Sequence, residues 1–423
     1  MDLFKKYSDM IKEQSEKNPE RARLMVRLGL TLKNFQESSF GTKGLPAPYE
    51  KLFVSSVNSI RRALARPERS VWTNIFGPVE IFQCLDLQGI SVEALSTFLT
   101  GFHIEDYLID TAEAAGIAPT LCSYHRSFLG GLLSGLLPTP LYSVTTSTVC
   151  DGNLSTFRFA SDMRSTGLKV LDVPHSYSPE GEKYLADQLR EMTAGLEEAA
   201  QCQLKMDDFR EVIRRENESR GYYREFLEAS KEICYPNTLT LNTCMLFATH
   251  LNIGTEETLT FFREMAEDIK NYGPYTGSRI LWVHLQPIYD EVMKEIFNLS
   301  YENNIQLYDF NLDYMEEMDE EHPFEALARK MICNQYNGDF SRKRRFLEDC
   351  MDEYRPDGVI HYCHWGCKQS AGGVSYLKKA AAERGIPMLI LDGDAIDRRN
   401  TPEGQIKTRT EAFLEMLKNR RRA

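Results

Sequence analysis

Two patterns of hydrophobic and polar positions alternate along this chain: one has the period of a helix, and the other is typical of buried strands. Over residues 1 to about 66, apolar residues recur at three- and four-residue intervals between charged ones, as at Val57, Ile60 and Leu64. This spacing predicts an N-terminal helical lobe over residues 1–66.

Short apolar runs bounded by turn residues follow the helical lobe and predict strands at 70–76, 141–149 and 169–173. A helix is expected over 79–87 with Gly89 as its stop, and long charged helices over 181–233. We assign residues 67–272 to a first α/β domain that carries these bridging helices.

A cluster of turn formers at 271–278 is the best linker candidate, and a second set of strands follows it. These strands are expected at 280–284, 305–309, 358–362 and 388–391, separated by helical segments. Alternation of strands and helices is typical of parallel sheets. The sequence therefore predicts an α/β fold with two doubly wound parallel-sheet domains, the second over 273–423, and an additional helical lobe.

Composition narrows the possible partners. The net charge of -12 argues against nucleic acid or an anionic membrane surface as a partner. No apolar run approaches the roughly 20 residues that span a bilayer, and the charged start of the chain does not resemble a signal peptide. We therefore expect a cytoplasmic protein. In a reducing compartment its ten cysteines are expected to serve packing, catalysis or metal binding rather than disulfides.

Candidate chemistry lies where predicted strands end. The strand at 358–362 runs directly into Cys363, His364 and Cys367, and in open parallel sheets this edge carries the ligand crevice. Cys150 follows the strand at 141–149 in the same way, and Cys122 stands at the start of a helix. The alternative is that these cysteines are small buried packing residues, the common fate of free cysteine.

Local motifs for common cofactors are absent from the sequence. There is no Gly-x-Gly-x-x-Gly fingerprint and no P-loop, so neither a dinucleotide nor ATP is expected to bind by those routes. Cys363 and Cys367 have no second close pair to complete a local zinc or iron-sulfur knuckle. A metal site would have to be assembled from distant segments, with thiolates from three loops meeting between the domains.

A series of short motifs runs from about residue 71 to 417: Leu121-Cys-Ser-Tyr-x-Arg126, Cys150-Asp-Gly152, Leu171-Asp-Val-Pro174, Asp357-Gly-Val-Ile360, Cys367-Lys-Gln369, Gly385-Ile-Pro387, Asp392-Gly-Asp394 and Gly404-Gln-x-x-Thr-Arg409. Together they resemble the 2-hydroxyacyl-CoA dehydratase family, which includes the benzoyl-CoA reductase subunits. The resemblance implies two flavodoxin-like or Rossmann-like domains with a helical part.

The resemblance also implies a cofactor and a reaction. It implies a [4Fe-4S] cluster with three cysteine ligands, Cys122, Cys150 and Cys367, with Cys363 as the fallback for the third. The reaction would remove water from an (R)-2-hydroxyacyl-CoA to give the (E)-2-enoyl-CoA through a ketyl radical. The implied alternatives are a benzoyl-CoA-reductase-type acyl-CoA reductase subunit, or a non-catalytic subunit that carries a cluster for electron transfer.

The partners also follow from the resemblance, and two further residues are candidates: His364 by its place beside the cysteine loop, and Asn74 by comparison with the family. A related second dehydratase subunit and a separate ATP-dependent iron-sulfur activator are expected, and the lack of a P-loop in this chain agrees with an external source of ATP-driven electrons. His364 could donate a hydrogen bond to substrate, or it could only satisfy backbone groups. Where many catalytic family subunits have Trp-Ser-x-Ser, this chain has Trp72-Thr-Asn-Ile75, so Asn74 is the candidate replacement for the serine, or a plain turn residue.

Overall fold

The computed structural model describes residues 3–422 and contains two four-stranded parallel sheets. Strand order is β2-β1-β3-β4 in the first sheet and β6-β5-β7-β8 in the second, so the two halves of the chain share one topology. The strands are β1 Ser70–Thr73, β2 Gln88–Ser91, β3 Tyr142–Thr146, β4 Gly167–Leu171, β5 Ser278–Val283, β6 Asn303–Tyr308, β7 Gly358–His364 and β8 Met388–Gly393. The predicted α/β class with two parallel sheets is confirmed.

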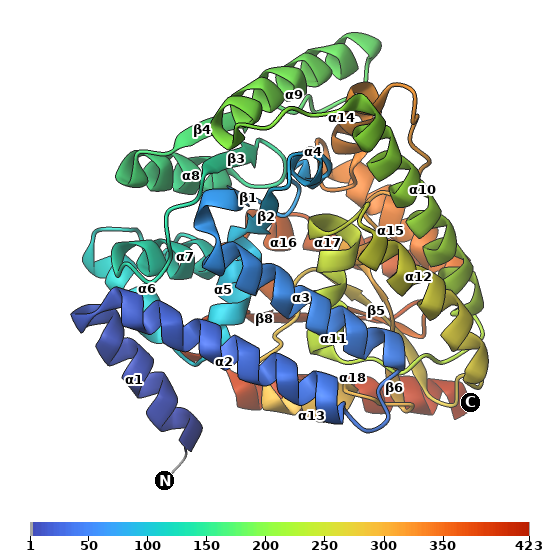
Figure 1. The fold of residues 1–423 in the computed structure, drawn as a ribbon. Coiled ribbons are helices and arrows are strands. Elements are labelled where there is room, and N and C mark those ends of the chain that lie inside the picture. The colour runs from blue at the N-terminus through green and yellow to red at the C-terminus, as the bar shows by residue number, and fades with distance from the viewer. Residues whose placement is uncertain (1–2, 423) are drawn as a thin grey trace.

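Helices surround both sheets, and the predicted N-terminal helical segment is present as α1 to α3. The helices are α1 Leu3–Lys17, α2 Pro19–Phe40, α3 Ala47–Ala65, α4 Val79–Cys84, α5 Val92–Thr100, α6 Glu105–Ala114, α7 Ser123–Leu133, α8 Asp151–Arg164, α9 Pro179–Ala200, α10 Met206–Ala229, α11 Leu239–Leu246, α12 Glu256–Asp268, α13 Glu291–Phe297, α14 Pro323–Cys333, α15 Phe340–Tyr354, α16 Lys368–Ala371, α17 Val374–Glu383 and α18 Glu403–Arg422. Figure 1 shows α2 and α3 side by side across one side of the molecule.

Burial explains why the strands form where the apolar runs lie. All seven residues of β7 are buried, and β7 pairs in parallel with β5 on one side and β8 on the other. A strand covered on both faces needs side chains that pack rather than alternate with polar ones, as Val359 and Ile360 do. The segment 357–370 therefore contains an inner strand of the second sheet, and the residues after this strand lie at the carboxyl edge of the sheet.

One strand was not expected from the sequence. Gly89 was predicted to stop a helix over 79–87, but it lies inside β2, and α4 ends earlier at Cys84. A Cβ at this position would approach Phe82 to 2.9 Å, so the glycine allows α4 to pack closely on the strand beside it. The prediction of a helix stop was therefore wrong, since the glycine serves close packing.

The long helices join the two halves, as expected for the segment 181–233. Helix α9 packs against α14, and Figure 1 shows the two side by side at one end of the molecule. Lys330 of α14 pairs with two buried carboxylates, Glu80 in α4 at 2.5 Å and Glu216 in α10 at 2.7 Å. The domain boundaries at 66 and 272 stay predictions. Among the described residues, no helix is long and apolar enough to cross a membrane.

Candidate functional site

A cavity of about 1920 Å³ lies where the carboxyl ends of strands from both sheets meet. Its wall includes residues that end or follow strands of each sheet, namely Phe76, Glu93, Cys150, His284, Tyr308 and Cys367. The cavity continues between the N-terminal helices, where apolar side chains of α1, α2, α3 and α5 line it. The position agrees with the expectation that ligands bind at the carboxyl edge of parallel strands.

Cys122, Cys150 and Cys367 all line this cavity, although they come from three distant segments. Each occupies the cap position directly before the first turn of a helix: α7, α8 and α16, respectively. The partial positive charge at a helix N-terminus favours a thiolate there. Three helix ends thus direct sulfur atoms into one space.

Glycines beside the cysteines allow this close approach. Gly366 has φ +78°, and a Cβ there would lie 2.9 Å from both the Cα and the backbone nitrogen of Cys122. A Cβ on Gly152 would lie 3.1 Å from the sulfur of Cys150. The loop that carries Cys367 can therefore rest on the backbone of Cys122 only because residue 366 has no side chain.

Each of the three sulfur atoms has an imidazole nitrogen as a neighbour. The Nε2–Sγ distances are 3.2 Å for His364 and Cys122, 3.3 Å for His284 and Cys367, and 3.9 Å for His125 and Cys150. The first pair joins β7 of the second sheet to the start of α7 in the first half of the chain. A neutral imidazole carries its proton on only one of its two nitrogens. The hydrogen bond that one nitrogen accepts therefore shows that the other nitrogen is the N–H donor.

A backbone hydrogen bond determines which ring nitrogen of His364 carries the proton. The amide of Ala395 donates to Nδ1 of His364 at 3.0 Å, which leaves Nε2 as the protonated nitrogen facing Cys122. Burial lowers the pKa of His364, so the ring is neutral at physiological pH. His364 is therefore an N–H donor toward the sulfur of Cys122. It does not line the cavity itself, and its proposed contact with substrate stays a prediction.

Burial also acts on the thiols. It raises the pKa of Cys122 well above its ordinary value, and the neighbouring charges of Cys367 and Cys150 raise it further. Burial likewise raises the pKa of Cys150 to about 11. Cys122 and Cys150, whose pKa values are raised by burial and by the neighbouring sulfurs, become thiolates together only when a cationic group lies among them.

Cys363 and Asn74 have different surroundings. Cys363 is buried beside the carbonyl of Ser370, 3.7 Å from its sulfur, and does not line the cavity. This position favours Cys367 over Cys363 as the sulfur donor of the loop. Asn74 is also off the cavity wall, and its amide donates to the hydroxyl of Thr146 at 3.0 Å, between β1 and β3. A catalytic role for Asn74 stays a prediction.

The polar residues of the cavity wall that were missed from the sequence include Glu93, His284 and Lys343. His284 directly follows β5 and has φ +72°, an uncommon conformation for a residue with a side chain and one that often marks a functional site. Burial raises the pKa of Glu93 to about 7. Only the strand-end position of His284 could have been noticed beforehand, because the other two belong to helices without a motif.

Within residues 3–422, no group of three or more Cys, His, Asp and Glu side chains is arranged to hold a single metal ion. The three cavity cysteines therefore do not form a mononuclear site. A multinuclear cluster is a different case, because each sulfur then binds a different metal atom and the sulfurs lie farther apart. Soft sulfur donors of this kind suit iron-sulfur clusters.

Residues 74–417 match the family described as 2-hydroxyglutaryl-CoA dehydratase, D-component. The chain belongs to this family. The match covers every strand except β1 and all three cavity cysteines, so the resemblance drawn from the short motifs is confirmed. The chain is accordingly a hydro-lyase subunit of the 2-hydroxyacyl-CoA dehydratase kind.

Three relatives with assigned activities agree with the family. The chain is 22% identical to the (R)-2-hydroxyisocaproyl-CoA dehydratase alpha subunit of Clostridioides difficile, with 83% of this chain and 90% of that protein covered. It is 24% identical to lactoyl-CoA dehydratase subunit alpha of Anaerotignum propionicum, with 84% and 92% covered. It is 22% identical to the (R)-phenyllactyl-CoA dehydratase alpha subunit of Clostridium sporogenes, with 84% and 91% covered.

Proposed function

We propose that this dehydratase subunit holds a [4Fe-4S] cluster through Cys122, Cys150 and Cys367 and removes water from an (R)-2-hydroxyacyl-CoA to give the (E)-2-enoyl-CoA. The observation that carries the proposal is that these three cysteines, and not Cys363, line one cavity from three helix starts. The relatives acting on 2-hydroxyacyl-CoA thioesters support the same substrate class.

The donor set fits the cluster chemically. A cluster held by three thiolates would supply an open iron that acts as a Lewis acid and a centre that exchanges one electron. The positive charge of iron would offset the cost of ionising the thiols, which the raised pKa values of Cys122 and Cys150 reflect. The neutral His364 would donate its Nε2 hydrogen toward the sulfur of Cys122, which orients that ligand and reduces its electron density.

The proposed function includes two partners. The three relatives are named as alpha subunits, which supports a second, related subunit beside this chain. The sequence has no P-loop, so ATP-driven electron supply would come from a separate iron-sulfur activator. The cavity of about 1920 Å³ has room for a thioester and the arm of CoA, and polar residues such as Glu93 and Lys343 line it together with the cysteines.

The test is anaerobic purification followed by iron and sulfide analysis and a dehydration assay. About four irons and four sulfides per chain are expected from one cube. Turnover of a 2-hydroxyacyl-CoA should require the second subunit, reduced activator and an initial charge of ATP, with ATP use far below product. ATP consumed in proportion to product would instead favour the reductase alternative. Iron-free protein after reconstitution would refute the proposal.

A further inference from the structure

Lys343 is an internal cation on the wall of the cavity. It projects from the first turn of α15, its side chain is 2% exposed, and it lines the same space as Cys367 and His284. Its Nζ lies 4.4 Å from the ring centroid of Tyr336 and 3.5 Å from Oδ2 of Asp309. Among residues 3–422, no hydrogen-bond acceptor is placed for this ammonium group.

Asp309 accounts for only part of the interaction that a buried ammonium needs. Its Oδ1 accepts the backbone N–H of His284 at 2.8 Å, and its Oδ2 accepts the hydroxyl of Tyr336 at 2.7 Å. Both oxygens thus have shorter bonds than the 3.5 Å contact with Lys343. Asp309 balances the charge of Lys343 and leaves its N–H donors open, a costly arrangement inside a protein unless another acceptor arrives.

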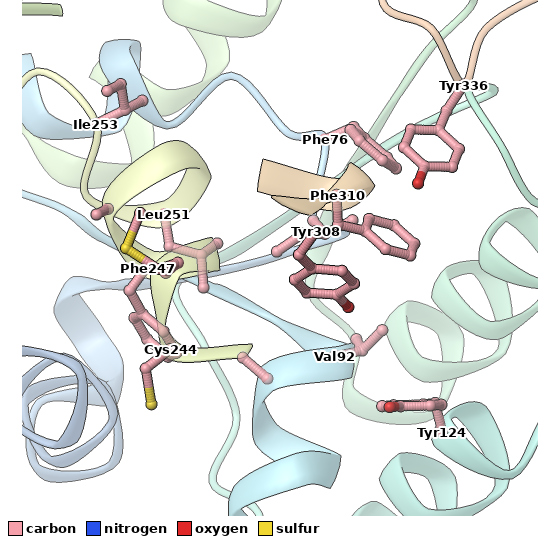
Figure 2. Packing of buried hydrophobic residues seen from close by; sticks show 14 of the residues in the cluster. Phe76, Val92, Tyr124, Cys244, Phe247, Leu251, Ile253, Tyr308, Phe310 and Tyr336 are labelled. Carbon is pink, nitrogen blue, oxygen red and sulfur yellow. The ribbon is translucent and has the colours of Figure 1, made fainter. Parts of the chain in front are cut away.

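The surroundings hold the ammonium group in place. The ring of Tyr336 stacks on Phe310 at 4.6 Å between centroids and also contacts Phe76 at 5.5 Å. Figure 2 shows these three rings gathered on one side of the cluster, with Tyr308 beside them. Because Tyr336 is fixed by its neighbours and by Asp309, the cation above its face is positioned before any ligand binds.

We propose that Lys343 donates a hydrogen bond to the thioester carbonyl oxygen of the acyl-CoA ligand. The inference rests on the proposed function, because it takes an acyl-CoA thioester as the occupant of the cavity. An ammonium only donates and a carbonyl only accepts, so the two are matched, whereas a hydroxyl also brings a proton of its own. A carbonyl is also preferred to a carboxylate, because Asp309 already neutralises the lysine.

This contact would also serve the reaction. In the proposed reaction, one electron from the reduced activator would add to the thioester carbonyl, which builds negative charge on the carbonyl oxygen before the neighbouring hydroxyl group leaves. A fixed and buried cation stabilises such charge more than it stabilises the resting thioester. Burial lowers the pKa of Lys343, and the nearby charges of Asp309 and Cys367 oppose that effect. Lys343 and Cys367 line the same cavity, so the ammonium group shares the space that the cysteine faces.

The test compares two ligands that differ at one oxygen. Butyryl-CoA has the thioester carbonyl, while S-butyl-CoA, its thioether analogue, has a methylene group there, and neither can lose water. Their affinities are measured by calorimetry on the anaerobically reconstituted protein with its second subunit. Lys343→Met should bind butyryl-CoA roughly tenfold to hundredfold more weakly, as expected for losing a hydrogen bond from a charged donor. Its affinity for S-butyl-CoA should not change.

Two further variants separate binding from folding. The double variant Asp309→Asn/Lys343→Met removes both charges, so that no carboxylate is left buried alone, and should show the same selective loss. Lys169→Met, which removes a surface lysine paired with Glu191, should bind both ligands as the wild type does. Equal weakening toward both ligands, or none, would overturn the inference while leaving the dehydratase function intact. Wild-type protein that binds neither ligand would refute both.

Discussion

His364 and Cys122 are 242 positions apart in the chain, yet Nε2 of the histidine lies 3.2 Å from the sulfur of the cysteine. The pair joins the central strand of the second sheet to a helix start in the first half. Ser123, next to Cys122, extends the junction by donating its hydroxyl to Asp394 at 2.6 Å. The candidate site is therefore also part of what fixes the two halves against each other.

His364→Ala should destabilise the fold as well as the site. The backbone N–H of Ala395 would lose its buried acceptor, which costs about 1–3 kcal/mol of unfolding free energy. Urea denaturation followed by circular dichroism measures the change. His322→Ala is the control, because His322 is exposed and pairs with Asp319 at the surface. Equal stability of the two variants would show that His364 does not connect the halves.

Single Cys→Ser variants test which sulfurs hold iron. Cys122→Ser, Cys150→Ser and Cys367→Ser should each lose most of the iron after anaerobic reconstitution, because serine is a poor ligand for a soft metal site. Iron and sulfide are measured per chain and compared with wild type.

Two other cysteines are the matched controls for this series. Cys363→Ser and Cys202→Ser should retain iron, since Cys363 lies off the cavity wall and Cys202 follows α9 near the surface. Loss of iron in Cys363→Ser together with its retention in Cys367→Ser would reverse the choice of ligand in this loop.

The fold could be predicted from the sequence because its strands are short, apolar and bounded by turn residues. The four strands of the second half were expected within a few residues of their observed positions, since β5, β6 and β7 are almost wholly buried and β8 alternates between buried and more exposed residues. Strand β2 was missed because Gln88-Gly-Ile-Ser91 has only one strongly apolar residue and follows a helix without a proline break. Its assignment depends on pairing with β1, which a local pattern does not contain.

The candidate site was only partly predictable. The cysteines stand out in the sequence because each follows a strand or starts a helix within a short motif. Lys343 and Glu93 have no such signal, because they reach the cavity through the packing of helices that are distant in sequence from the cysteines. Contacts between segments that are distant in sequence determine which charged residues are buried, and a local sequence pattern does not contain these contacts.

Glu93 should make stability depend on pH near neutrality. Its pKa is raised by burial to about 7 in the folded chain, against 4.5 as its ordinary value. Between these two values the folded chain holds a proton that the unfolded chain has released, so stability falls as pH rises, by up to about 1.4 kcal/mol per pH unit. Above pH 7 both states are ionised and the loss is complete.

Glu93→Gln removes this titration and provides the comparison. The difference in unfolding free energy between the variant and wild type should grow in favour of the variant from about pH 4.5 to 7 and then remain constant. Urea denaturation at intervals across this range measures it. A difference that is independent of pH would mean that Glu93 is ionised in the folded chain as readily as in the unfolded one.

Gly366→Ala should separate the cost of backbone strain from the cost of moving the cysteine loop. Gly366 and Gly385 both have a positive φ, +78° and +68°, so alanine at either position carries a strain of about 1–2 kcal/mol. At Gly385 the added Cβ meets no described atom within 4 Å, whereas at Gly366 it would press on the backbone of Cys122 at 2.9 Å. Gly366→Ala should therefore cost about 1–3 kcal/mol of unfolding free energy beyond Gly385→Ala in urea denaturation, as overpacking does.

Gly366→Ala should also lower the iron content, since Cys367 would move away from Cys122, while Gly385→Ala keeps its iron. Variants that match in both stability and iron content would show that this close approach does not assemble the site.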